Sequence, residues 1–230
     1  MSVTTWDPTK IRARAGKIFL LANPYTAASP PTGTTPATYL ATYLANFYTD
    51  GSTQTAMAGG LTPWANVEAK GFDFDAKYKS VMFDPAVGLP INAGKYLESA
   101  IGSCSIADMS VAKFIDILSA TSNEVITIAK GVSQAAKSAI LLGVTPYNTR
   151  YMALYQWPSL DTTGTPIVGQ YDNLFMPRVC IDPDIKVTFA KSKVSEITVK
   201  LVPESDLWLV SPDSGMYAAA VYQETTSAHT

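Results

Sequence analysis

Residues 71–80, GFDFDAKYKS, alternate apolar and charged side chains with great regularity. Successive side chains of an extended chain point to opposite faces, so this alternation predicts a β-strand with one apolar and one charged face. The apolar face would consist of Phe72, Phe74, Ala76 and Tyr78, and the charged face of Asp73, Asp75, Lys77 and Lys79. The charged face changes sign halfway along the strand. It either meets water, as in an ordinary half-buried strand, or meets another subunit.

The principal helix is expected at about residues 110–120, in the segment ADMSVAKFIDILSATSN. Its apolar positions recur at helical spacing and form one stripe, made of Val111, Phe114, Ile115 and Leu118. Asp108 or Ser110 can cap its first turn. This is the most sustained helical pattern in the sequence.

Residues 23–70 form a long insert that opens with NPYTAASPPTGTTPA, a composition that supports neither a helix nor a central strand. A short amphipathic helix is expected inside it, with Thr35 as N-cap, Pro36 at the first position and Asp50-Gly51 as a stop. Its apolar positions are Tyr39, Leu40, Tyr43, Leu44 and Phe47. The segment TQTAMAGGLTPWANV then returns the chain as further loop.

Short strand-like runs separated by turn residues fill much of the remaining chain. They are KIFLLA, the run from residue 96 to 106, EVITIAK, SAILLGV, RYMALYQW, NLFMPRVCI, IKVTFA, SEITVKLV, DLWLV and MYAAAVYQ. Such spacing predicts a mainly β fold, a β-sandwich or partial barrel with one principal flanking helix and a long loop insert. We expect a single domain over residues 1–230, with an N-terminal arm at residues 1–16.

Charge and cysteine content narrow the choice of partners and compartment. The chain has 17 basic and 19 acidic residues and a net charge of -2, so no overall field attracts nucleic acid or an anionic membrane. The dense basic cluster is Lys10, Arg12, Arg14 and Lys17 in the arm. Cys104 and Cys180 lie in separate strand-like runs, which predicts buried free thiols in a reducing cytoplasm. The apolar run at residues 18–22 is too short for a signal peptide or a membrane anchor.

Two segments resemble enzyme motifs but lack other residues that those motifs require. GLPINAGKY resembles a phosphate-binding loop, but it has five residues between Gly88 and Gly94 where the motif needs four, and Tyr96 stands where a hydroxyl should reach magnesium. SVAK has the Ser-x-x-Lys spacing of acyl-transfer enzymes, but the partner elements of those enzymes are missing from the sequence. A connecting turn and a capping serine explain the two segments more simply.

Catalytic and metal-binding side chains are also scarce. His229 is the only histidine and is the penultimate residue, which argues against a histidine base or a zinc site within one chain. Two carboxylate pairs, Asp73 with Asp75 and Asp182 with Asp184, could in principle serve a metal or glycoside hydrolysis. A strand's polar face and an Asp-Pro-Asp turn explain them more simply. We therefore expect neither catalysis nor an obligatory cofactor or metal.

The order of these elements resembles the tail tube, or major tail, proteins of long-tailed bacteriophages. The order is a basic arm, a first strand, a Pro/Thr-rich insert, a charged strand, a strand that runs into one principal helix, and a train of strands. The segments most similar to the family are residues 96–120 and RVCIDPDIKVTFAKSKVSEITVKLVPE at residues 178–204. The resemblance implies a β-sandwich with a flanking helix, assembled into hexameric rings that stack into a hollow virion tail tube for genome passage.

The resemblance also implies partners and contact surfaces. The partners would be other copies of the chain, tail proteins such as the tape measure and terminator, and DNA passing non-specifically through a neutral or acidic lumen. We expect the arm and the insert to make contacts between subunits or stacked rings. The expected interface residues are Arg12, Arg14, Lys17, Tyr39, Tyr43, Phe47, Trp64, Asp73, Asp75, Lys77 and Lys79. The alternative is that the insert folds back over its own sandwich.

Other functions remain open at this point. A monomeric β-sandwich that binds a ligand through exposed aromatic residues, or acts as a hydrolase, would use Trp64, Tyr151, Tyr155 or Trp157. A tail terminator, a sheath protein or a capsid decoration protein would share the structural role without forming the tube.

Overall fold

The strands and helices follow the predicted order closely. The computed structural model describes residues 10–13, 16–26, 28–48, 61, 63–67, 71–83, 91–106, 111–118, 125–128, 137–140, 149–182, 186–190, 193–204 and 219–225. The helices in this part of the chain are α1 (Pro36–Leu44) and α2 (Val111–Leu118). The strands are β1 (Lys10–Ala13), β2 (Lys17–Ala22), β3 (Ala65–Asn66), β4 (Phe72–Phe83), β5 (Ile91–Ile106), β6 (Val125–Ile128), β7 (Lys137–Ile140), β8 (Tyr151–Leu160), β9 (Pro166–Ile181), β10 (Lys186–Ala190), β11 (Lys193–Pro203) and β12 (Ala220–Thr225). The expected strand DLWLV lies outside the described residues.

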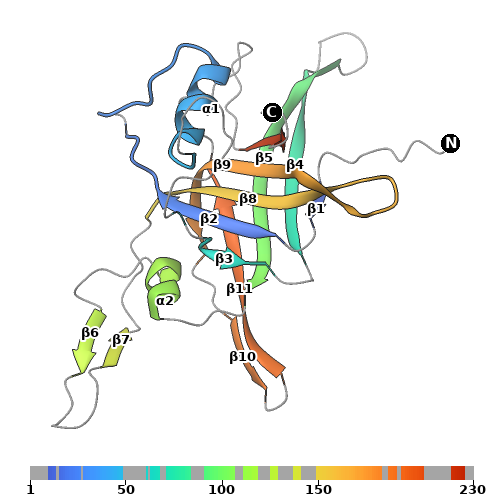
Figure 1. Cartoon of the computed structure of the whole chain (residues 1–230). Helices are drawn as coiled ribbons and strands as arrows, with labels where there is room; N and C mark the ends of the chain where they lie inside the picture. Colours follow the sequence, from blue (N-terminus) through green and yellow to red (C-terminus); the bar gives the residue numbers. More distant parts are fainter. Residues whose placement is uncertain are drawn as a thin grey trace.

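Ten of these strands form one antiparallel sheet that folds over itself. Its order is β1-β4-β5-β11-β9-β8-β2-β3, with β10 added to β11 and β12 added to β9, while β6 and β7 form a separate hairpin. Figure 1 shows β2, β8 and β9 crossing in front of β4, β5 and β11. Strands β9 and β11 are paired over only three residue pairs, which leaves the two layers free to diverge. The predicted mainly β sandwich or partial barrel is confirmed.

The N-terminal strands join the two layers at a corner. β1 pairs with β4 in one layer and β2 pairs with β8 in the other, although only residues 14–16 separate β1 from β2. So short a connection spans at most about 14 Å, so the two layers lie close together here. Gly16 fits the corner because a Cβ at this position would collide with the carbonyl of Gln156 and the ring of Tyr155.

The core between the layers is centred on stacked aromatic rings. Phe72 of β4 stacks on Tyr155 of β8 with ring centroids 4.6 Å apart, and Tyr155 stacks in turn on Trp157 at 5.2 Å. Apolar residues of both layers surround them, including Ile18, Cys104, Ile106, Leu174, Met176, Val179, Ile197, Val199 and Leu201. Gly102 on β5 faces Phe72, where a Cβ would overlap the ring. The absence of a side chain at this position makes room for the aromatic stack.

The layer of β2, β8 and β9 is apolar on its other face as well. Its outward residues Phe19, Met152, Leu154 and Phe175 are buried under the insert, which contributes Tyr43, Leu44, Phe47 and Tyr48. The edge of Phe47 meets Phe175 at 5.9 Å between centroids, and Tyr25 packs edge-on against Tyr43 at 4.9 Å. Figure 1 shows α1 lying outside this layer. The chain therefore has three layers at this point, and the insert covers its own sandwich.

The burial of the insert corrects three of the expected interface residues. Tyr43 and Phe47 are 0% exposed and Trp64 is 8% exposed within a single chain, so these side chains fill its core and cannot face a neighbouring subunit. The reason is that β8 is apolar on both faces and needs cover on both. Tyr39 is only partly buried against the same cluster.

Both helices begin where their sequence signals predict. Thr35 caps α1 through its side chain, which accepts from the amide of Thr38, and Pro36 occupies the first turn. The helix ends at Leu44, and the stop expected at Asp50-Gly51 lies outside the described residues. α2 spans 111–118, within the predicted range, and buries Ile117 in the central core.

Trp64 ties α2 to the sandwich. Its indole Nε1 donates to Asp116 Oδ2 at 2.6 Å, and the Lys113 ammonium lies 4.8 Å from the ring centroid. The backbone immediately after Trp64 forms β3, which pairs with β2. The prediction of loop for residues 65–66 is therefore wrong, because the two residues extend the edge of the sheet.

The assignment of the insert to the core predicts a large loss of stability on truncating Phe47. Phe47→Ala should lower the free energy of unfolding by about 3–5 kcal/mol, because it removes a fully buried ring and leaves a cavity beside Phe175. Urea unfolding followed by circular dichroism measures the change. Ala37→Ser, at an exposed position of α1 in the same insert, is the matched control and should change stability by less than about 0.5 kcal/mol. Equal stability of Phe47→Ala and the wild type would contradict the layered core.

Candidate interaction surface

The outer face of β4, β5 and β11 differs from the covered layer because it is polar and accessible. Asp73, Asp75 and Lys77 are exposed on β4, and Ser99 and Thr198 are exposed on the neighbouring strands. Ser103, Ser105 and Lys200 are partly exposed on the same layer. Ile101 interrupts this polar surface with 43% exposure. We call these residues the polar face.

The alternation predicted for β4 is confirmed over most of its length. Phe72, Phe74 and Ala76 are buried, whereas the charged residues between them are exposed. Tyr78 is the exception to the predicted apolar face, since it is 52% exposed. The extra residue Glu98 on β5 shifts the register beside Tyr78, and Figure 1 shows the β4–β5 ribbon continuing past the crossing strands. Tyr78 lies at this bulge, two residues beyond the buried Ala76, and the core does not cover it.

The basic arm meets the acidic half of β4 within the same chain. The register of β1 on β4 places Arg12 opposite Asp73 and Lys10 opposite Asp75. Opposite charges at facing positions of an antiparallel pair favour that register. This pairing lies within one chain, and a contact of Arg12 with a neighbouring subunit stays a prediction. Arg14 lies outside the described residues, and Lys17 is exposed at the start of β2.

A cluster of four residues links β9, the end of β11 and the start of β8. Its members are Arg150, Arg178, Cys180 and Glu204. Glu204 accepts from Arg150 Nε at 3.0 Å and from Arg178 Nε at 2.8 Å, and Arg150 Nη2 lies 2.9 Å from the other carboxylate oxygen. Cys180 Sγ donates to Glu204 Oε1 at 3.1 Å. The side chains of the three charged residues are about one-third exposed. One carboxylate thus connects three segments that are distant in sequence.

The environment of Glu204 favours its charged form. Partial burial alone would raise the pKa of Glu204, but the bonds from Cys180, Arg150 and Arg178 outweigh this effect and lower it. Burial, together with the same carboxylate, raises the pKa of the Cys180 thiol to about 11. Burial raises the pKa of Cys104 to about 12. Both cysteines are free, as predicted, and both remain protonated thiols at neutral pH rather than nucleophilic thiolates.

Sequence reasoning missed this cluster, although part of its signal was visible. Arg178, Cys180 and Asp182 alternate with buried Val179 and Ile181, so a common outward face of β9 was predictable. The pairing of β9 with β11, which brings Glu204 beside Arg178, is a long-range contact that alternation cannot reveal.

The candidate carboxylate pairs do not converge on a metal site in the described part of the chain. Asp182 lies on the outer surface, where Lys200 Nζ is 3.5 Å from its Oδ2, and Asp184 lies outside the described residues. Asp73 and Asp75 lie on an exposed strand face. Over the described ranges, no group of three or more His, Cys, Asp or Glu side chains could hold a metal ion. Ser110 of the Ser-x-x-Lys segment, residues 88–90 of the loop-like motif and His229 are outside those ranges.

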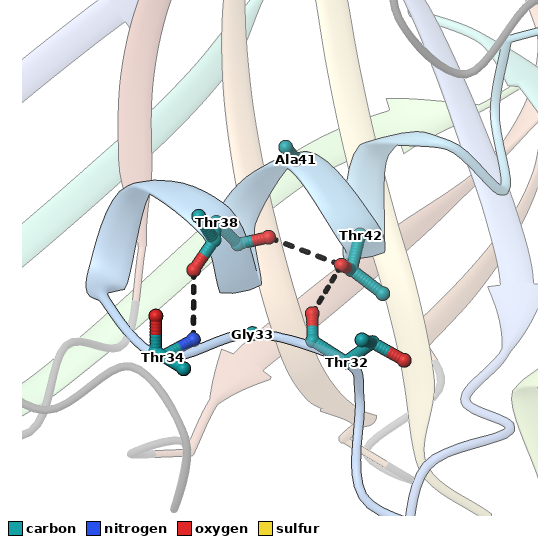
Figure 2. Close-up of a pocket in the computed structure, with 6 residues that line it drawn as sticks. All are labelled: Thr32, Gly33, Thr34, Thr38, Ala41 and Thr42. Atoms are coloured by element: carbon teal, nitrogen blue, oxygen red, sulfur yellow. Dashed lines mark hydrogen bonds between the residues drawn. The ribbon is translucent and has the colours of Figure 1, made fainter.

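A threonine-lined hollow of about 440 Å³ lies beside the start of α1 (Figure 2). Its lining residues are Thr32, Gly33, Thr34, Thr38, Ala41 and Thr42. Its polar groups bond to one another: Thr38 Oγ1 accepts from the amide of Thr34 at 2.9 Å, and Thr42 Oγ1 donates to the carbonyls of Thr32 and Thr38. These bonds complete the helix cap, so the hollow is a consequence of capping rather than a prepared ligand site.

Comparisons with known proteins do not assign the chain to a family. No protein-family model matches the chain, and no curated protein matches it. Among solved structures, the chain is similar to one described as the crystal structure of Hcp protein, with a TM-score of 0.33 and 10% identity over 81% of this chain and 87% of that chain. A superposition at this score does not establish a common fold. In the described part of the chain, neither helix is long and apolar enough to cross a membrane.

The geometry of Glu204 predicts a pH-dependent loss of stability. Glu204→Gln should lower the free energy of unfolding by about 1–3 kcal/mol at neutral pH, because it leaves two guanidinium groups without their carboxylate. The pKa of Glu204 is lowered in the folded protein, so its contribution is complete above its unfolded pKa of about 4.3 and disappears as the pH falls through the folded value. The difference between variant and wild type should therefore shrink below about pH 4.

Urea unfolding at neutral and acidic pH tests this prediction. Asp182→Asn is the matched control, because the ion pair of Asp182 with Lys200 is longer and similarly exposed, and the substitution should cost less than about 1 kcal/mol. A Glu204→Gln penalty that stays constant down to pH 3 would show that the carboxylate charge is not responsible.

Proposed function

We propose that this protein is a non-enzymatic structural subunit that assembles with copies of itself into rings, which stack into a hollow tube. The observation that carries the proposal is the asymmetry of the two layers. The layer of β2, β8 and β9 is covered on both faces, whereas the layer of β4, β5 and β11 has an accessible outer face and ends at a four-residue edge strand. An edge strand with free backbone groups is a liability in a monomer and a joint in an assembly.

The charges of the polar face are compatible with this role. Asp73 and Asp75 are followed by Lys77 and Lys79 on one strand, and the Lys200–Asp182 pair and the Glu204 cluster continue the surface with both signs. Mixed charge on a subunit surface disfavours random association and fixes the register of specific contacts. A lumen wall of mixed or acidic charge would also let DNA pass, because a strongly basic wall would hold phosphates through counterion release.

The more specific assignment follows the resemblance in element order. We propose a bacteriophage tail tube, located in the virion tail and built from hexameric rings, with the tape measure and terminator proteins as further partners. A monomeric binding module would instead need an accessible aromatic site. Of the four aromatic residues expected for it, Trp64, Tyr151 and Tyr155 are buried and Trp157 is partly exposed. Another tail or capsid structural protein remains the alternative that microscopy would reveal.

The purified full chain should form large ordered particles. We expect sedimentation velocity to show species much heavier than a monomer, and negative-stain microscopy to show rings or tubes with a central channel. Far-ultraviolet circular dichroism of the same fractions should retain a β spectrum, which separates ordered assembly from aggregation. A single monomeric species at all protein concentrations would contradict the proposal, and solid particles or sheath-like particles would favour the other structural roles.

A further inference from the structure

The turn between β8 and β9 is rigidly built although it is fully exposed. Asp161 Oδ1 accepts from the amide of Thr163 at 2.8 Å, from the hydroxyl of Thr163 at 2.7 Å and from the amide of Thr165 at 2.9 Å. The amide of Asp161 also donates to the carbonyl of Thr165 at 2.9 Å. Gly164 adopts a φ of 84°, which the turn requires and which side chains disfavour. The tip is therefore ordered before any partner arrives.

Beyond this turn, a bulge directs Val168 into solvent. Leu160 pairs with Pro166 and Pro158 pairs with Tyr171, so the single residue Ser159 faces residues 167–170. Gly169 has a φ of 74° inside the bulge. Ser159 is buried, whereas Val168 is 93% exposed. Bulges re-aim side chains and are often functional, so the exposure of Val168 has a structural cause.

The ribbon also lacks the charges that normally protect an exposed strand. Residues 162–171, TTGTPIVGQY, contain no charged side chain. Figure 1 shows the β8–β9 hairpin projecting well beyond the sandwich. Natural proteins usually protect such ribbons with lysine or other charges, because uncharged edges pair with other chains. A projecting ribbon whose residues 162–171 are uncharged and whose Val168 is exposed is therefore suited to contact another protein chain.

We propose that the tip of the β8–β9 ribbon, anchored by Val168, docks onto a second copy of this chain. The same molecule offers exposed apolar side chains on other elements, Tyr78 on β4, Ile101 on β5 and Val221 on β12. A protruding apolar residue and separate apolar positions on one chain are the components of a heterologous contact, in which different surfaces of two copies meet. Residues 162–171 bring no charge that would have to be desolvated on docking, and the carboxylate of Asp161 is already bonded within the turn. This inference rests on the proposed self-assembly and adds the element that makes the contact.

The test compares two substitutions at one position. Val168→Asp should weaken self-association at least about tenfold, because the buried anchor becomes a charge, whereas Val168→Ile should keep it. The side chain is almost fully exposed in one chain, so neither change should alter the urea midpoint of the unassembled protein. Sedimentation over a range of concentrations measures association. A photoreactive phenylalanine in place of Thr162, in the exposed turn of the same ribbon, should cross-link to a second copy.

The outcomes separate this inference from the proposed function. Loss of association in Val168→Asp alone, together with cross-links at 162, supports the docking role. Wild-type-like assembly of Val168→Asp, or assemblies without cross-links at 162, overturns the docking role and leaves the proposed function standing. If the wild-type protein remains monomeric at every concentration and the photoreactive variant at 162 gives no cross-linked dimer, both are overturned.

Discussion

The two-sided burial of the β2, β8 and β9 layer is the constraint on which the rest of the structure depends. Tyr155 faces inward to stack on Phe72, while Leu154 faces outward under the insert. A strand that is apolar on both faces cannot remain in a two-layer sandwich with one face in water. The second sheet layer covers one side, and the segment around α1 must cover the other. The long insert is thus required by the core of this chain.

That requirement limits where contacts between copies can form. Because Tyr43 and Phe47 are committed to the internal layer, the insert cannot offer them to a neighbour. In the described part of the chain, the accessible positions include the polar face of the other layer and the ribbons that extend past the sandwich. The register of β1 on β4 places Lys10 opposite Asp75 and Arg12 opposite Asp73 within the same chain. The acidic half of β4 therefore has a basic partner strand in its own chain.

Local sequence patterns predicted the strands and helices well, but they did not predict which of these elements pack against one another. Alternation located β4, and capping with helical spacing located α1 and α2, because each of these signals is contained within one segment. The burial of Phe47 was not predictable, since an amphipathic helix has the same pattern whether it covers its own sheet or a neighbouring subunit. The Glu204 cluster depends on pairing between distant strands, and the exposure of Tyr78 depends on where the opposite layer ends. Such features follow from the tertiary arrangement of the elements. The local periodicity of a single sequence does not reveal that arrangement.

The distribution of charge then distinguishes the kinds of surface on the molecule. At the junction of β9 and β11, Glu204 is bonded to two arginines, so these charges mainly hold the chain together. The β8–β9 tip shows the opposite arrangement, since its one carboxylate, Asp161, is occupied by the turn and its most exposed large side chain is Val168. Contacts formed there would depend on apolar burial rather than on ion pairs, and they would be less sensitive to salt than contacts made by the polar face.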